Sequence, residues 1–298
     1  MRSRFYKRQK RNGSTWSNFT RSERSGNINR RNFIKDLSVL PVSGVIGHEI
    51  DKMKSEPIIF SSQRNNKSIK IGIIGFGFRG EQLARATKHA HPDWIKEQEE
   101  AHKKDSRNKV LEDFYSQQDL NVEIVAVCDV FDVRIERGIA VGGKNTQGFN
   151  DYRKLLAQKD IDVVIISTPD HWHMQMGIDA ANAGKHVYME KCMTRTAKEA
   201  VQLKKSIKDN SIVFQLGHQG RQSDLQKKAK GLYEKGTLGK VTLVETTTNR
   251  NNPFAAWIWP IHEKASDKTI DWERFQEPAP KKVPYNAERF FRWRCWWD

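Results

Sequence analysis

The sequence predicts an α/β fold built on a doubly wound parallel sheet. Three observations support this fold class. Apolar runs without polar alternation, such as Val163-Val164-Ile165-Ile166, are typical of parallel strands buried on both faces. These runs alternate with segments of helical periodicity, as βαβ units require. A glycine-rich segment follows the first run, where such sheets bind ligands.

The elements follow one another in a regular order. Strands are predicted at 69–74, 122–128, 162–167, 186–189 and 211–216, and a Thr-rich strand at 241–248. Helices are predicted at 80–103, 133–139, 150–158, 173–183 and 196–209, with a charged helical insert reaching about 118. We therefore divide the chain into a basic leader (1–67), a domain of alternating strands and helices (68–217) and the start of a second domain (218–298).

The positive charge of the 298-residue chain is concentrated in its leader. The formal net charge is +16, and residues 1–70 carry 16 Lys/Arg against 5 Asp/Glu. A basic arm can bind nucleic acid or an anionic membrane surface. The remaining body holds 36 basic and 31 acidic residues, without a basic stripe, so we expect no nucleic-acid partner.

The leader contains a possible export signal. Arg30-Arg31-Asn32-Phe33-Ile34-Lys35 precedes a modest apolar region at 37–47, which resembles a twin-arginine signal. Asp36 interrupts the approach to that region, and no small-x-small cleavage site is visible. We expect a periplasmic or exported protein that uses the machinery for folded proteins; the alternative is a cytoplasmic protein with an arginine-rich leader.

Neither a disulfide framework nor a metal site is expected. The three cysteines, Cys128, Cys192 and Cys295, are far apart, and none belongs to a C-x-x-C pair. His171 and His173 lie close together, but a zinc site needs at least a third ligand.

The segment Gly75-Phe76-Gly77-Phe78-Arg79-Gly80 has the G-x-G-x-x-G pattern between a strand and a helix. Gly75 allows the tight turn, Gly77 lets the backbone approach a pyrophosphate, and Gly80 lets the helix pack closely on the strand. The helix N-terminus offers N–H groups to the phosphates. This context predicts a dinucleotide-binding Rossmann domain, and we expect all six residues to contact the cofactor.

Asp129, at the end of the second strand, is the candidate acceptor for the adenosine ribose hydroxyls. Its carboxylate would repel the 2′-phosphate of NADP, which favours NAD. The usual spacing from the glycine motif is about 20 residues, and the helical insert accounts for the longer spacing here. Arg134 could instead serve a 2′-phosphate, so NADP stays open.

The third long strand opens into Ser167-Thr168-Pro169-Asp170-His171-Trp172-His173. Ligands in such sheets bind beyond the carboxyl ends of the strands. We expect this loop to line the cofactor cleft through Thr168, Pro169 and His173, with His173 starting the next helix.

Four stretches together resemble the Gfo/Idh/MocA oxidoreductase family: IGIIGFGFRG (71–80), VAVCD (125–129), VIISTPDHWH (164–173) and AGKHVYMEKCMTRT (183–196). GHQGRQ (217–222) and GKVTLVETTTNRN (239–251) resemble its secreted bacterial branch. The resemblance covers about 68–298. It implies a Rossmann domain and an open-faced α/β domain with a sugar, polyol or sugar derivative between them, and permits a homo-oligomer through the second domain.

The resemblance also implies roles for individual residues. The family's E-K-P motif reads Glu190-Lys191-Cys192 here, so Cys192 stands where the family has a proline that permits a cis peptide bond. Glu190 would contact the cofactor, and Lys191 would contact the reacting hydroxyl as the catalytic residue. Further positions implied to face the cofactor or the substrate are Gln219 for the nicotinamide, and His218, Arg221 and Arg250, with Asn249, for the substrate.

The C-terminal segment is rich in aromatic residues. Six of the nine tryptophans follow residue 256; we expect core packing for most, with one or two lining the sugar site. The resemblance implies a later D-x-x-x-H pair with an acid/base histidine, and no such pair follows the nucleotide-binding domain here. We therefore expect a substrate domain that is truncated.

These observations favour an NAD(P)-dependent oxidoreductase that transfers a hydride between a secondary alcohol carbon and the nicotinamide. Two alternatives stay open. One is a redox-assisted glycosidase that uses NAD transiently: oxidation at one sugar carbon acidifies the neighbouring C–H, the leaving group departs, and the hydride returns. The other is a catalytically incomplete fragment that binds the nucleotide and does no chemistry.

Overall fold

The computed structural model describes residues 68–218, 220, 223–247 and 258–296. All of them lie in Asn66–Asp298, the second of the two units into which the chain divides. The predicted leader and its arginine pair lie outside the described residues. Within the described ranges, no helix is long and apolar enough to cross a membrane.

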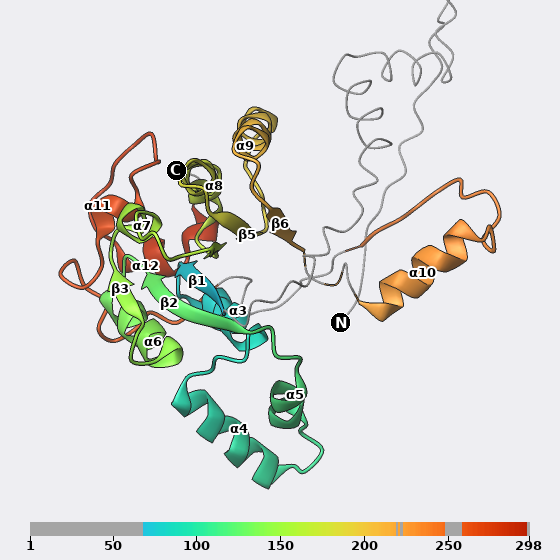
Figure 1. Ribbon diagram of the computed structural model, residues 1–298, viewed down its shortest axis with the longest axis horizontal. Helices are drawn as coiled ribbons and strands as arrows, with labels where there is room; N and C mark the ends of the chain where they lie inside the picture. The colour runs from blue at the N-terminus through green and yellow to red at the C-terminus, as the bar shows by residue number, and fades with distance from the viewer. Residues whose placement is uncertain (1–67, 219, 221–222, 248–257, 297–298) are drawn as a thin grey trace, which may run out of the picture. The chain divides into compact units, whose positions relative to one another are not determined.

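A six-stranded parallel sheet forms the centre of this unit (Figure 1). In chain order its strands are β1 (Ile69–Ile74), β2 (Val122–Cys128), β3 (Gln147–Phe149), β4 (Val163–Ile166), β5 (His186–Glu190) and β6 (Phe214–Gly217). They lie in the order β3-β2-β1-β4-β5-β6. The order reverses between β1 and β4, which pair with Ile74 opposite Ile166. The doubly wound sheet predicted from the sequence is therefore confirmed, and its switch point is at the ends of these two strands.

Both faces of the sheet are buried. The neighbouring residues Ile73 and Ile74 point to opposite faces because side chains alternate along a strand. They belong to two separate apolar clusters, and both are at most 1% exposed. Five helices follow the strands: α3 (Phe78–Ala86), α6 (Asp132–Gly142), α7 (Tyr152–Leu156), α8 (Asp170–Asn182) and α9 (Ala197–Asp209). Burial on both faces explains why these strands have continuous apolar sequences.

The single long helix predicted at 80–103 is wrong. The structure has α3 and then a separate helix, α4 (Pro92–Lys104), with a third, α5 (Val110–Ser116), completing the insert. Pro92 cannot donate a backbone hydrogen bond within a helix, but it suits a helix start. The His91 side chain caps α4 by accepting the Asp93 N–H at 3.2 Å. The proline therefore divides the apolar periodicity into two helices.

Other segments also differ from prediction. Residues 147–149 were expected in a loop but form β3, which pairs with the end of β2. Helix α8 begins at Asp170, immediately after Pro169, rather than at His173. Proline has a fixed φ that suits the residue preceding a helix, so the short loop after β4 ends earlier than its polar sequence suggests.

The strand predicted at 241–248 is not formed over its described part, residues 241–247. These residues are exposed, and Leu243 and Val244 are about three-quarters exposed. An alternating pattern becomes a strand only when a neighbour pairs its backbone N–H and C=O groups. Among the described residues, this segment has no such neighbour.

The remaining elements are helical: α10 (Asp224–Glu234), α11 (Trp272–Phe275), α12 (Ala287–Phe291) and the 3₁₀ turn η1 (Trp293–Cys295). The segment 258–296 packs against the nucleotide-binding domain. Ile270 forms an antiparallel bridge with Phe131, just beyond β2. The Asp271 N–H donates to the Val130 carbonyl at 2.8 Å, and the Asp132 N–H donates to the Thr269 carbonyl at 3.0 Å.

Candidate cofactor site

A cleft of about 1090 Å³ lies at the carboxyl ends of β1, β2, β4 and β5. Its lining includes Gly77 of the glycine-rich loop, Asp129 after β2, Thr168 after β4 and Lys191 after β5. Four predicted regions that are distant in sequence therefore meet at one edge of the sheet. This is the edge at which open α/β sheets bind ligands.

The glycine-rich loop is shaped by close backbone contacts. Gly75 has a φ of +87°, and a Cβ there would lie 2.9 Å from the backbone of Ser167 and Thr168. A Cβ on Gly80 would lie 2.3 Å from the Gly75 carbonyl oxygen. The Gly75 N–H donates to the Cys128 carbonyl at 2.7 Å, and the Ser167 hydroxyl donates to the Gly75 carbonyl at 2.6 Å. Only glycine fits at these two positions.

Gly77 differs from the other two glycines because no atom lies within 4 Å of the place a Cβ would occupy. That place faces the cleft, since Gly77 is among the lining residues. Helix α3 begins at the next residue, and the N–H groups of its first turn have no partner within the helix. Open space before a helix N-terminus fits the pyrophosphate of a dinucleotide, so Gly75, Gly77 and the first turn of α3 would hold it.

Asp129 connects the glycine-rich loop to the residues after β2. Its Oδ2 accepts the Phe76 N–H at 2.7 Å, and its Oδ1 accepts the Phe131 N–H at 3.0 Å. Burial raises the pKa of this carboxyl, whereas these two hydrogen bonds and the positive charge of Arg134 oppose that rise. A carboxylate has about four acceptor positions, so the group can also accept a hydroxyl of an adenosine ribose.

The loop after β4 contributes Thr168, Pro169 and Trp172 to the cleft. His173 lies behind it: the side chain is fully buried, with Nε2 2.9 Å from the Thr168 carbonyl and Nδ1 against the Cys192 carbonyl. His173 therefore bridges two cleft-lining loops, and it is not among the residues that line the cleft.

Glu190 and Lys191 line the cleft at the end of β5, across the switch point from Asp129. Glu190 is 4% exposed, and its carboxylate pairs with the Arg79 guanidinium at 2.8 Å. Burial, followed by the negative charge of Glu190, raises the pKa of Tyr188. A Cβ on Gly217 would lie 2.4 Å from the Tyr188 hydroxyl. The Lys191–Cys192 peptide bond is cis.

The structure does not bring every predicted residue into the cleft. Phe76 and Gly80 of the glycine motif are buried and outside the cleft lining, and Phe76 contacts Asp129 through its backbone N–H. His218, at the end of β6, is exposed and outside the cleft lining. Gln219, Arg221 and Arg250 lie outside the described residues, as does Asn249. Among the described residues, no group of three His, Cys, Asp or Glu side chains could hold a metal ion.

The sequence predicted that one or two C-terminal tryptophans would line the site; in the structure Trp259 and Trp293 belong to a cleft wall formed by the segment 258–296. Its lining residues include Trp259, Pro260, His262, Phe275, Phe290, Phe291, Trp293 and Arg294. Trp259 contacts Phe78 of the glycine-rich loop, with ring centroids 5.1 Å apart. Trp272, in contrast, is buried and donates its indole N–H to the Val283 carbonyl at 2.7 Å. The clustered tryptophans were a signal, but their partners could not be deduced from spacing.

Hydrogen bonds and ion pairs hold this wall in place. The Phe275 carbonyl accepts the indole N–H of Trp172 at 3.0 Å and lies 3.1 Å from Nε2 of His171. Arg294 pairs with Asp170 at 2.9 Å. These contacts connect the wall to the first turn of α8.

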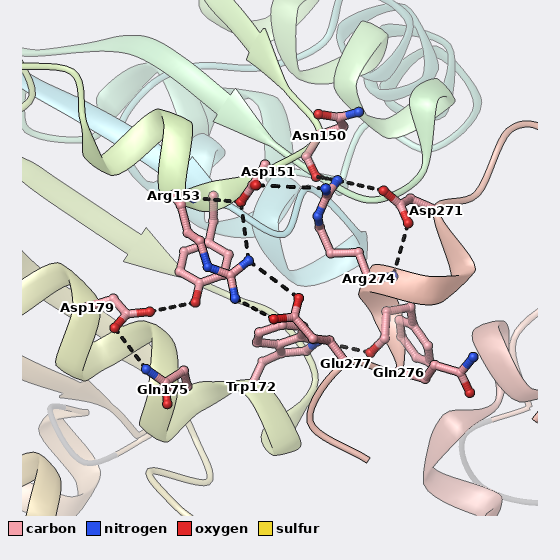
Figure 2. Close-up of polar contacts among 12 residues, drawn as sticks. Asn150, Asp151, Arg153, Trp172, Gln175, Asp179, Asp271, Arg274, Gln276 and Glu277 are labelled. Carbon is pink, nitrogen blue, oxygen red and sulfur yellow. Dashed lines mark hydrogen bonds and ion pairs between the residues drawn. The ribbon is translucent and has the colours of Figure 1, made fainter. Parts of the chain in front are cut away.

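A second set of contacts joins the wall to the start of α7. Figure 2 shows Arg153 between Asp151 and Glu277, and Arg274 directed toward Asn150 and Asp271. Nη2 of Arg153 lies 2.6 Å from Oε1 of Glu277. The wall is therefore attached to both α7 and α8, which pack against each other through Tyr152 and Trp172.

Comparison with known proteins identifies this domain. Residues 69–218 match the profile described as "Oxidoreductase family, NAD-binding Rossmann fold", Gfo/Idh/MocA. Similar curated proteins include a levoglucosan dehydrogenase from Pseudarthrobacter phenanthrenivorans (36% identity over 31% of this chain and 24% of that protein). An inositol 2-dehydrogenase from Salmonella paratyphi B is 28% identical over 48% of this chain and 45% of its own. A glycosyl hydrolase family 109 protein from Shewanella putrefaciens is 28% identical over 59% and 36%.

The solved structures that resemble this chain match only part of its length. A myo-inositol 2-dehydrogenase from Lactobacillus plantarum has a TM-score of 0.46 and 26% identity, covering 59% of this chain and 43% of that one. The chain spans less than half the length of the curated relatives described above. The family profile nevertheless covers half of the chain, including the glycine-rich loop, Asp129 and the Glu190–Lys191 pair, and it specifies NAD as the nucleotide of the fold. The chain belongs to the Gfo/Idh/MocA oxidoreductase family.

Proposed function

We propose that this protein is an NAD-dependent oxidoreductase that transfers a hydride between a secondary alcohol carbon of a sugar or polyol and the nicotinamide. The observation that carries the proposal is the shared cleft. Gly77 and Asp129, which would bind the nucleotide, line the same cleft as Glu190 and Lys191. The relatives named as levoglucosan and inositol dehydrogenases support this substrate class.

Each residue has a distinct task in this proposal. The first turn of α3 binds the pyrophosphate, and Asp129 accepts the adenosine ribose hydroxyls. NAD, when bound, supplies the nicotinamide C4 that exchanges the hydride. Lys191 donates a hydrogen bond from Nζ to the reacting hydroxyl and stabilises the negative charge that develops on its oxygen. The aromatic wall, which includes Trp259 and Phe275, excludes water from the cleft.

A two-part experiment tests the proposal. Calorimetry on the full chain measures NAD binding beside an Asp129→Ala variant, and NADH fluorescence measures turnover with a panel of inositols, pyranoses and anhydrosugars. We expect Lys191→Ala to lose turnover while keeping NAD affinity, and Lys198→Ala, an exposed lysine on α9, to match the wild type. Absence of NAD binding by folded protein would contradict the cofactor site. NAD binding without turnover on any substrate would favour a nucleotide-binding protein.

The similarity to glycosyl hydrolase family 109 proteins supports a second candidate, glycoside cleavage with transient use of NAD. In this reaction oxidation at one sugar carbon acidifies the neighbouring C–H, the leaving group departs, and the hydride returns to the sugar. Release of a chromogenic aglycone without accumulation of NADH would identify it. Accumulation of NADH in proportion to oxidised sugar would identify the simple dehydrogenase instead.

We also propose that the protein is exported in folded form. The support is the sequence Arg30-Arg31-Asn32-Phe33-Ile34-Lys35. Residues 1–67 fused to a reporter should be exported by a bacterium that has the twin-arginine machinery. Replacing Arg30 and Arg31 by lysine should keep the reporter inside, and equal export of both fusions would contradict the signal.

A further inference from the structure

One carboxylate at the nucleotide end of the cleft is surrounded by three guanidinium groups. Glu81, in the first turn of α3, lies 3.4 Å from Nη1 of Arg134 and 3.6 Å from Nη1 of Arg85. Arg137 contacts the same carboxylate through Nε, and through Nη2 at 3.3 Å. Arg134 and Arg137 come from α6, one turn apart, so the two helices hold this cluster together.

The cluster belongs to the cleft. Glu81, Arg134 and Arg137 all line it, together with Asp129. The Glu81 side chain is 12% exposed, and the arginine side chains are 27% and 31% exposed. Partial burial of the carboxylate reduces solvent screening, so its attraction to the arginines is stronger than in an exposed pair.

The arrangement resembles a phosphate site in which an acidic side chain occupies the place of the anion. The guanidinium groups of Arg134 and Arg137 lie beside Asp129, the proposed acceptor for the ribose hydroxyls. Guanidinium groups in such a place are suited to bind a phosphate on that ribose. Glu81 pairs with the guanidinium N–H groups of both arginines and adds a negative charge to the site. A 2′-phosphate would have to displace this carboxylate and would be repelled by Asp129 as well.

We infer that Glu81 is a determinant of cofactor specificity that keeps Arg134 and Arg137 from binding a 2′-phosphate. The protein therefore selects NAD over NADP by two separate means. Asp129 acts at the ribose hydroxyls, and Glu81 acts by occupying the arginines. The inference rests on the proposed dinucleotide site, and it assigns the role of Arg134 that the sequence left open.

The test is the affinity of the full chain for NAD and for NADP, measured by calorimetry. Glu81→Gln keeps the size of the side chain and removes its charge. We expect NADP to bind on the order of tenfold more tightly, as gain of one charge-assisted hydrogen bond would give. The affinity for NAD should change less than about twofold, since NAD has no 2′-phosphate. The gain for NADP should shrink as ionic strength rises.

Three further variants define the mechanism. Glu136→Gln makes the same charge change at an exposed cleft residue on α6 and should leave the NADP affinity unchanged. Adding Arg134→Gln to Glu81→Gln should remove the gain. If Glu81→Gln alone unfolds, then Glu81→Gln with Arg85→Gln keeps the net charge of the cluster, and the same gain for NADP is expected.

The outcomes separate this inference from the proposed function. Unchanged NADP affinity in folded Glu81→Gln, or an equal gain in Glu136→Gln, would overturn the role of Glu81 while NAD binding stands. Tighter binding of NADP than of NAD by the wild type would also overturn it. Failure of the wild-type chain to bind either nucleotide would instead count against the dinucleotide site.

Discussion

Replacing Gly77 by alanine separates binding from folding at the glycine-rich loop. Gly77 has φ −76° and ψ −167°, which alanine adopts without strain. No heavy atom lies within 4 Å of the added Cβ, so the methyl group projects into the cleft. It would occupy the space in which the pyrophosphate approaches the backbone.

The expected magnitudes follow from these two facts. Alanine lowers the entropy of the unfolded chain but is a poorer residue than glycine before a helix, so the free energy of unfolding should change by less than about 1 kcal/mol. Loss of a charge-assisted hydrogen bond between the loop and a displaced phosphate costs about 1.5–3 kcal/mol. The NAD dissociation constant should therefore rise by roughly tenfold to a hundredfold.

Gly80→Ala is the matched control because its Cβ would lie 2.3 Å from the Gly75 carbonyl oxygen. This contact is with backbone, so the helix must shift, and we expect a loss of about 1–3 kcal/mol in unfolding free energy. Denaturant unfolding and calorimetry with NAD measure both variants. Wild-type NAD affinity in Gly77→Ala would refute the placement of the pyrophosphate. Severe destabilisation by Gly77→Ala would refute the structural argument.

Three predictions concern the wall formed by 258–296. Arg294→Ala removes the partly buried pair with Asp170; the unfolding free energy should fall by at most about 1 kcal/mol, and stopped-flow measurement should show faster NAD dissociation. Trp272→Ala deletes a buried side chain stacked on Phe275 and should cost about 3–5 kcal/mol in denaturant unfolding. Burial lowers the pKa of His171 in the folded protein. The stability that the neutral side chain contributes is therefore present above the ordinary histidine pKa and is lost as pH falls through the pKa of the folded state. His171→Gln should reduce this loss of stability at acid pH in thermal unfolding, and an unchanged pH profile would contradict the prediction.

Short-range sequence patterns predicted the nucleotide-binding domain well. Runs such as Val163–Ile166 identify strands buried on both faces, because polar residues are excluded from both sides. The glycine motif identifies the loop because Gly75 and Gly80 have no room for a Cβ and Gly77 leaves open space beside the backbone. Periodicity alone could not show the break at Pro92, since the apolar pattern continues across it. Gln147–Phe149 is too short for its pairing with β2 to be visible in the sequence.

The wall of the cleft could not be predicted because its contacts are distant in sequence. Trp259 meets Phe78, and Phe275 accepts hydrogen bonds from the start of α8, yet neither pair has a spacing that signals contact. The same holds for Glu81, which looks like an ordinary acidic residue in the first turn of a helix. Only the fold brings Arg137 to it.

The pair formed by Arg79 and Glu190 joins the start of α3 to the end of β5. Glu190 is buried, and a buried carboxylate without a partner would be strongly destabilising, so Arg79 is needed for its charge as well as its position. Arg79 belongs to the first turn of α3, where the phosphates bind in our proposal, and Glu190 immediately precedes Lys191. The ion pair therefore fixes the backbone before Lys191 relative to the glycine-rich loop. The glycine-rich loop and the proposed catalytic lysine are consequently held in a fixed position relative to each other, although they belong to two separate sequence motifs.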